Sequence, residues 1–233
     1  MSWTYEWAAN LKDMRSWESF LKLASQAGLP LGATISARRD NMERGTGTAA
    51  SGEGSRAGAQ AVVQFWREAG PGLWFAKNDE FDRQFRDRFL NLHEAAVRGD
   101  LKEWLSSPDE ALALLLLLDQ FPRNAFRGSS RMYASDGLAR EAAEAAIEAG
   151  HDRKVDPSMQ LFFYLPFGHS ENLADQERAV ALSERLGEPD LSHARRHRAI
   201  IKRFGRFPHR NPILGRAMPP EEQEFLDEGG YGG

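Results

Sequence analysis

Hydrophobic residues recur every three or four positions along most of the chain, which is the spacing of a helix that buries one face. The pattern is clear over residues 79–99, where Phe81, Phe85 and Phe89 are four residues apart and a glycine ends the segment. No stretch alternates apolar and polar residues over the length of a strand. The sequence therefore predicts an all-α fold built from antiparallel helical hairpins with short connections.

Prolines, glycines and capping residues predict where the other helices begin and end. Ser107 and Pro108 open a helix made almost entirely of leucine and alanine, which we expect Pro122 to end. Leucines cover every side of this helix, so we expect it at the centre of the bundle. Asp136 is expected to cap the next helix. The remaining helices are predicted over these ranges: 136–150, 156–166, 172–187, 191–205 and a short one from 219.

The composition changes sharply along the first sixty residues. Residues 1–32 carry tryptophan and leucine at helical spacing and predict an N-terminal amphipathic helical extension. Residues 33–59 are rich in Gly, Ser, Thr, Ala and Arg with almost no large apolar side chain, which predicts a flexible linker. A new apolar pattern then begins, so residues 60–233 are predicted to form one all-helical domain.

The composition also limits the class of protein. The 233 residues are 41% hydrophobic and include no cysteine, which excludes disulfides, thiolate metal sites and a cysteine nucleophile. The longest apolar run, Ala111–Leu118, is far shorter than the roughly 20 residues that cross a bilayer. The N-terminus lacks the features of a secretory signal. We therefore expect a cytoplasmic protein without a membrane partner, and the sequence does not predict its oligomeric state.

Positive charge is concentrated in residues 191–216, which we call the basic segment. It holds eight Lys or Arg residues and no acid, whereas the rest of the chain has 22 bases and 34 acids. Two interpretations follow: the segment pairs with acids elsewhere in the protein, or it binds an anion. Arginine outnumbers lysine seven to one in it. Arginine forks suit specific carboxylate or phosphate contacts, which argues against a diffuse nucleic-acid surface.

A short polar pattern occurs twice. Phe121–Asn124 reads Phe-Pro-Arg-Asn, and Phe207–Asn211 repeats it with one inserted His. Each copy is expected to close a helix and to place a cation and an amide there. Asp119 precedes the first copy at a helix C-terminus, where an acid is unfavourable by up to about 1 kcal/mol and needs a cationic partner. His169 lies in a third polar segment between two predicted helices.

These segments supply the candidate site. His169 and His209 are the candidate general bases, and the arginines are candidates to hold an anion. In the alternative interpretation the same groups form buried ion pairs that only join helices. The candidate ligand-binding residues are Asp119, Gln120, Arg123, Asn124, Tyr164, His169, Asp175, Gln176, His197, Arg206, His209, Arg210 and Asn211.

One pair of histidines has the spacing of metal ligands, and the chain has no cofactor-binding motif. His193 and His197 have the four-residue spacing of two metal ligands on one helix, but the arginines between and beside them would repel a cation. The chain contains no phosphate-binding glycine loop, dinucleotide fingerprint or nucleophile elbow. We therefore predict no metal and no cofactor.

Four motifs in order carry a family resemblance: Trp74-Phe75 with the helix from Asp79 to Phe89, Leu118–Asn124, Tyr164–Gln176 with its Leu-Pro-Phe and His-Ser-Glu runs, and Arg203–Asn211. With these motifs, residues 60 to 226 resemble the bacterial domain-of-unknown-function 924 family. The resemblance implies a tetratricopeptide-like superhelical bundle and no established activity. Residues 1–59 lie outside it.

The leading functional hypothesis is a helical domain whose Arg, His and Asp pocket binds an anionic small molecule or a peptide carboxylate. A hydrolase that uses His169 or His209 as general base is the first alternative. A tetratricopeptide-like scaffold for protein interactions, in which the polar helix ends are structural, is the second.

Overall fold

The computed structural model describes the backbone of residues 48–232 and the side chains of residues 55–232. Every regular element in that range is helical, and no strand occurs there, which confirms the predicted all-α class. Residues 56–233 form a compact unit of their own, and the fold described below is that of this unit. The predicted amphipathic extension and residues 33–47 of the predicted linker lie outside the described residues.

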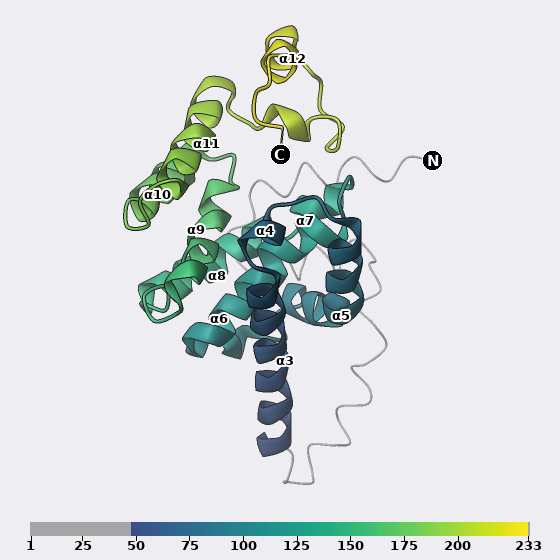
Figure 1. Cartoon of the computed structure of the whole chain (residues 1–233), viewed down its shortest axis with the longest axis vertical. Helices are drawn as coiled ribbons and strands as arrows, with labels where there is room; N and C mark the ends of the chain where they lie inside the picture. Colours follow the sequence, from purple (N-terminus) through teal and green to yellow (C-terminus); the bar gives the residue numbers. More distant parts are fainter. Residues whose placement is uncertain (1–47, 233) are drawn as a thin grey trace. The chain divides into compact units, whose positions relative to one another are not determined.

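The unit consists of α-helices, labelled in Figure 1, with several short 3₁₀ or π turns between them. The α-helices are α3 Thr48–Ala69, α4 Pro71–Trp74, α5 Asp79–Val97, α6 Pro108–Leu115, α7 Phe121–Ala125, α8 Asp136–Glu148, α9 Leu161–Gly168, α10 Leu173–Ser183, α11 Asp190–Phe204 and α12 Pro220–Asp227. The short elements are η2 Lys102–Ser106, η3 Leu116–Gln120, η4 Ser130–Tyr133, η5 Pro157–Met159 and η6 Pro208–Arg210.

The leucine-rich segment forms the centre of the unit, as its pattern predicts. All leucines of α6 and η3 are at most 3% exposed. α6 packs against α8 and α9, and η3 packs against α5, α8 and α9. Each fully buried leucine contributes about 1.5–3 kcal/mol of transfer free energy. This burial accounts for a helix with no polar face and fixes the end of the leucine segment, where Asp119 lies.

Pro122 does not end this helical segment, contrary to the prediction. After α6 the chain forms the π-helical turn η3, and α7 then begins with Pro122 in its first turn. A proline is compatible with that position because the carbonyl oxygens of the preceding turn have other donors: Leu117 O accepts from His93 Nδ1, and Leu118 O accepts from the Ser135 hydroxyl. The wider turn shifts the register between α6 and α7. The chain therefore continues through residues 116–125 as one helical path with an internal change of pitch.

Two other prolines also lie inside or at the start of helical turns. Pro166 lies within α9, which continues to Gly168 instead of stopping at residue 165. Pro208 is in the first turn of η6, so the second motif copy opens a helical turn after α11 has ended at Phe204. The expectation that each motif copy closes a helix is therefore wrong. In both copies the proline starts a short helix that carries the arginine.

The start of the helical unit also differs from the prediction. α3 begins at Thr48, so the last twelve residues of the predicted linker are helical and the expected boundary at residue 60 lies inside α3. Ala59 is 1% exposed, and a Cβ at Gly58 would lie 3.5 Å from Leu92. The small residues that suggest a linker thus allow close packing of this helix against α5. No helix within the described residues is long and apolar enough to cross a membrane.

Candidate functional site

Asp119 is the most buried acid of the predicted site. It lies in η3, is 1% exposed and accepts hydrogen bonds from His169 Nδ1 at 2.8 Å and Gln120 Nε2 at 2.6 Å. Arg123 Nη1 lies 3.3 Å from its Oδ1 and donates to its carbonyl oxygen at 2.7 Å. Burial alone would raise the pKa of Asp119, but Arg123 and His169 together lower it to about 2. The carboxylate is therefore ionised, and the predicted need for a cationic partner is met by Arg123.

His169 follows the end of α9 and binds Asp119 through Nδ1. Burial and the charge of Arg123 lower its pKa, against the opposing effect of Asp119, so the imidazole is neutral at neutral pH. An ionised carboxylate can only accept a hydrogen bond, so Nδ1 carries the proton. The Nε2 atom of His169 is then an acceptor with no hydrogen-bond partner among residues 55–232. This arrangement orients a potential general base.

The arginines of the two motif copies converge on one carboxylate. Arg123 Nη2 lies 2.9 Å from Asp136 Oδ1, and Arg210 Nη1 lies 3.6 Å from Asp136 Oδ2. The ring of Tyr133 lies 4.5 Å from the Arg210 guanidinium carbon and 5.9 Å from that of Arg123. The residues that meet here are Asp119, Arg123, Tyr133, Asp136, His169 and Arg210, and we call them the polar cluster.

Arg210 has fewer partners than its burial demands. The residue is 6% exposed, and Nη2 donates to the carbonyl oxygen of His169 at 2.9 Å. Its Nε has no hydrogen-bond partner among residues 55–232, and the contact of Nη1 with Asp136 is long. Burial lowers the pKa of this guanidinium, although nearby acids oppose the effect. A buried cation with a free donor is costly unless a further acceptor satisfies it.

The asparagines of the two copies lie outside the polar cluster and make a matching contact. Asn124 donates to Asp82 at 2.7 Å, and Asn211 donates to Glu222 at 2.6 Å. Each carboxylate also binds one arginine, Arg127 in the first case and Arg206 in the second. In both copies of the pattern the arginine belongs to the polar cluster, and the asparagine donates a hydrogen bond to a carboxylate from another helix.

Several arginines of the basic segment pair with acids outside it. Arg203 binds Glu221, and Arg206 binds Glu222. Arg216 binds both oxygens of Glu171, at 2.7 and 2.9 Å, and the Phe207 N–H donates to the same carboxylate. Glu171 therefore joins the third motif to the fourth. For these arginines, pairing with acids elsewhere in the protein explains the positive charge. Arg206 binds Glu222 and does not belong to the polar cluster.

Two of the remaining candidates, Gln176 and Asp175, hold the chain segment around His169, whereas Tyr164 lies apart from the polar cluster. The Gln176 side chain donates to the carbonyl oxygens of Gly168 and Ser170, both at 2.7 Å, and so fixes the chain on either side of His169. Asp175 accepts from the Ser170 hydroxyl at 2.6 Å. Tyr164 donates to the buried Asp152 at 2.9 Å, and burial with this contact raises its pKa to about 12. Tyr164 therefore belongs to a separate contact.

His197 and His209 lie in an aromatic group around Tyr231. Their ring centroids lie 4.6 and 5.2 Å from that of Tyr231. Burial and neighbouring cationic groups lower the pKa of His197 to about 3 and that of His209 to about 4. His209 makes no hydrogen bond to a carboxylate among the described residues, and its buried Nδ1 has no partner. Of the two candidate bases, His169 alone has an acid that orients it.

Two members of the polar cluster, Tyr133 and Asp136, were not predicted from the sequence as site residues. Asp136 was expected to cap α8, but it is the first residue of that helix and Ser135 occupies the capping position. An acid in a first helical turn has an ordinary electrostatic explanation, so its second role gave no signal. Tyr133 lies in η4, a segment without a distinctive pattern. Neither residue could be assigned without the tertiary contacts.

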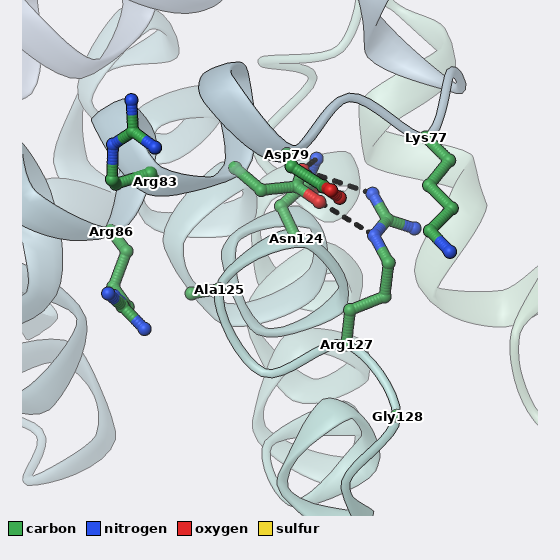
Figure 2. Close-up of a pocket in the computed structure, with 9 residues that line it drawn as sticks. Lys77, Asp79, Arg83, Arg86, Asn124, Ala125, Arg127 and Gly128 are labelled. Atoms are coloured by element: carbon green, nitrogen blue, oxygen red, sulfur yellow. Dashed lines mark hydrogen bonds and ion pairs between the residues drawn. The ribbon is translucent and has the colours of Figure 1, made fainter.

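A cleft of about 450 Å³, lined by no residue of the polar cluster, lies beside α5 and α7 (Figure 2). Of the candidate residues, Asn124 alone lines it. The cleft is bordered mainly by charged side chains that the sequence analysis did not single out.

Comparison with known proteins places the chain in a family. The family model described as a bacterial protein of unknown function, DUF924, matches residues 62–230. A solved structure of a protein of unknown function from Agrobacterium tumefaciens is 52% identical, with a TM-score of 0.74, and the match covers 75% of this chain and 99% of that one. No curated protein matches the chain. The chain belongs to the DUF924 family of bacterial proteins, whose function is unknown.

Proposed function

We propose that the polar cluster binds an anionic small molecule through Arg210, Arg123 and His169. The observation that carries the proposal is the buried Arg210 guanidinium, which makes one hydrogen bond to the described part of the chain and leaves its Nε without a partner there. A carboxylate or phosphate oxygen is the acceptor that such a guanidinium binds most strongly. Arg123 is held beside it by the shared Asp136, so two arginines face one ligand from two different helical turns.

The charge of the cluster predicts how binding depends on pH. Two carboxylates and two guanidiniums balance when His169 is neutral. A bound anion adds negative charge and favours the imidazolium form of His169, whose pKa is lowered in the free protein. Binding should therefore take up a proton. We expect the affinity to increase as the pH falls from 7.5 to about 6, as linkage requires.

A thermal-shift titration tests the proposal. Dicarboxylates at millimolar concentration should raise the Tm of the full chain, because a ligand at 100 times its Kd stabilises a protein by about 2.7 kcal/mol. Arg210→Lys keeps the charge but removes the fork, and it should abolish the shift. Arg203→Gln is the matched control, since this exposed arginine of the basic segment lies outside the polar cluster.

Three outcomes would contradict the proposal. If none of the anions shifts the Tm, the interpretation as ion pairs that join helices is correct. An equal shift in the wild type and Arg210→Lys would place binding elsewhere. An affinity that does not change between pH 7.5 and 6 would remove His169 from the site.

The second candidate function is hydrolysis with His169 as general base. The Asp119–His169 hydrogen bond favours it, because an ionised, buried acid fixes the imidazole with Nε2 as acceptor. Arg123 and Arg210 would then stabilise negative charge that develops on the substrate. A screen with chromogenic esters and phosphate esters tests this candidate. His169→Ala should lower kcat by about 100-fold or more, and His209→Ala should keep most of it. Equal loss in both variants would contradict the assignment.

The cytoplasmic location, the lack of nucleic-acid binding and the tetratricopeptide-like arrangement stay predictions of the sequence. The scaffold hypothesis has no specific support from a contact or surface of the described residues.

A further inference from the structure

The cleft beside α5 and α7 has a lining with an excess of positive charge. Four cations and two acids line it: Lys77, Arg83, Arg86, Arg127, Asp79 and Asp82. Figure 2 shows Arg83 and Arg86 on one side, Lys77 and Arg127 on the other, and Asp79 between them. Its volume of about 450 Å³ lies in the range of small-molecule sites. The charged lining favours a polar, anionic occupant.

One wall of the cleft is rigid. Asp82 is 9% exposed and accepts hydrogen bonds from Arg127 Nε at 2.7 Å, Arg127 Nη2 at 3.1 Å and Asn124 Nδ2 at 2.7 Å. The bidentate contact neutralises this carboxylate and holds the guanidinium plane in one orientation. Arg127 Nη1 makes no hydrogen bond within the described part of the chain. The Nη1 group of Arg127 is therefore a donor of fixed orientation that is free to bind a ligand, although Arg127 is already paired with Asp82.

The other cations of the cleft are available. Lys77 is exposed and has no carboxylate within 4.0 Å among residues 55–232. Arg83 and Arg86 pair with Glu80 and Asp87 on their own helix, and these arginine side chains are 57% and 50% exposed. Exposed pairs of this kind contribute little to stability, so a ligand can replace them at small cost.

We infer that this cleft binds a small phosphate monoester that carries a hydroxyl group. The phosphate oxygens would accept from Lys77 and the free Nη1 of Arg127, which lie on the same side of the cleft in Figure 2, and Arg86 on the opposite side would add attraction for the anion. Asp79 explains the hydroxyl: its carboxylate is a poor neighbour for a phosphate but a good acceptor for a ligand O–H. This site is separate from the polar cluster and does not depend on the function proposed for it.

Isothermal titration of the full chain at low ionic strength tests the inference, with inorganic phosphate, glycerol 3-phosphate and glycerol as probes. We expect glycerol 3-phosphate to bind more tightly than phosphate, and glycerol not to bind. The double variant Lys77→Gln/Arg86→Gln should weaken glycerol 3-phosphate binding at least tenfold, because it removes two exposed cations that no folding contact requires. Arg98→Gln is the matched control, since it removes an exposed arginine that follows α5 and lies outside the cleft.

Two further variants separate this site from other sources of phosphate binding. Asp79→Asn should strengthen inorganic phosphate binding and reduce the preference for glycerol 3-phosphate. An unchanged preference would overturn the role of Asp79. Arg210→Lys, in the polar cluster, should leave the binding of both probes unchanged. If it removes their binding while Lys77→Gln/Arg86→Gln does not, the phosphate is bound at the polar cluster and the inference is wrong. Absence of heat with every probe would also overturn it.

Discussion

The properties of Asp119 arise from its partners more than from its position in the helix. An isolated carboxylate that is 1% exposed would be neutral, because burial penalises the charged form. Here Arg123, His169 and Gln120 provide charge and hydrogen bonds, and the pKa falls to about 2. One buried acid thereby fixes the orientation of an arginine and a histidine. Loss of this carboxylate should therefore lower the free energy of unfolding.

The first prediction concerns this residue. Asp119→Asn keeps the size of the side chain but leaves the buried Arg123 with only Asp136 as a charged partner. Breaking one partner of a buried ion pair costs about 3–5 kcal/mol, and we expect a loss near the lower limit since an amide oxygen still accepts. Urea denaturation measures the free energy of unfolding. Asp100→Asn, at an exposed acid paired with Arg98, should change it by less than about 0.5 kcal/mol.

A loss below about 1 kcal/mol for Asp119→Asn would mean that the contacts of this carboxylate do not hold the polar cluster together.

Helix ends in this protein are set by glycine more reliably than by proline. Pro122, Pro166 and Pro208 lie in or at the start of helical turns, whereas α11 ends at Gly205 with a φ of 70°. A residue with a Cβ is strained in this left-handed conformation. A proline lacks the N–H donor and its ring clashes with the carbonyl four residues before it, and a change of pitch such as η3 accommodates both effects.

The second prediction compares two glycines. A Cβ at Gly205 or at Gly137 would have no heavy atom within 4 Å, so neither alanine variant clashes. Gly205→Ala should lose about 1 kcal/mol from left-handed strain. Gly137→Ala lies inside α8 and should gain about 0.5–1 kcal/mol, because alanine restricts the unfolded chain. Denaturation midpoints of the two variants and the wild type give both values. A gain at Gly205 would contradict the left-handed end of α11.

At the scale of the whole unit, contacts far apart in sequence join the four motifs. The first motif is tied to the second by Asp82 and Asn124. The second is tied to the third by Asp119 and His169, and the third to the fourth by Glu171 and the Phe207 N–H. The chain end adds Tyr231, whose ring contacts His197 and His209. Neutral, partly buried histidines of this kind make the fold sensitive to acid.

The third prediction is the sign of this pH dependence. The folded-state pKa values of His197 and His209 are lowered to about 3 and 4, so between those values and 6.5 the unfolded chain binds more protons than the folded chain. Their contribution is therefore complete above pH 6.5 and is lost as the pH falls. Linkage gives a loss of up to about 2 kcal/mol per histidine from pH 7 to pH 5. Asp119 does not interfere, because it titrates below this range.

Variants of one helix test the assignment. His197→Asn cannot become charged and should flatten the fall of unfolding free energy from pH 7 to pH 5. His193→Asn, at an exposed histidine one turn earlier in α11, should keep the wild-type slope. Some slope remains in His197→Asn, since burial also lowers the pKa of His93 and His169. Equal slopes for the wild type and both variants would show that His197 is not the sensitive group.

The sequence by itself determined the helical class, the buried leucine segment and most of the polar residues that matter. These features depend on local periodicity and composition, which a single segment contains. Tertiary structure decided the rest. In the folded protein Arg123 and Arg210 both lie beside Asp136. The acid that binds His169 is the buried Asp119, and Arg206 pairs with Glu222. Pairing of this kind depends on distances between residues up to 74 positions apart in the sequence, and no local pattern encodes which acid meets which base.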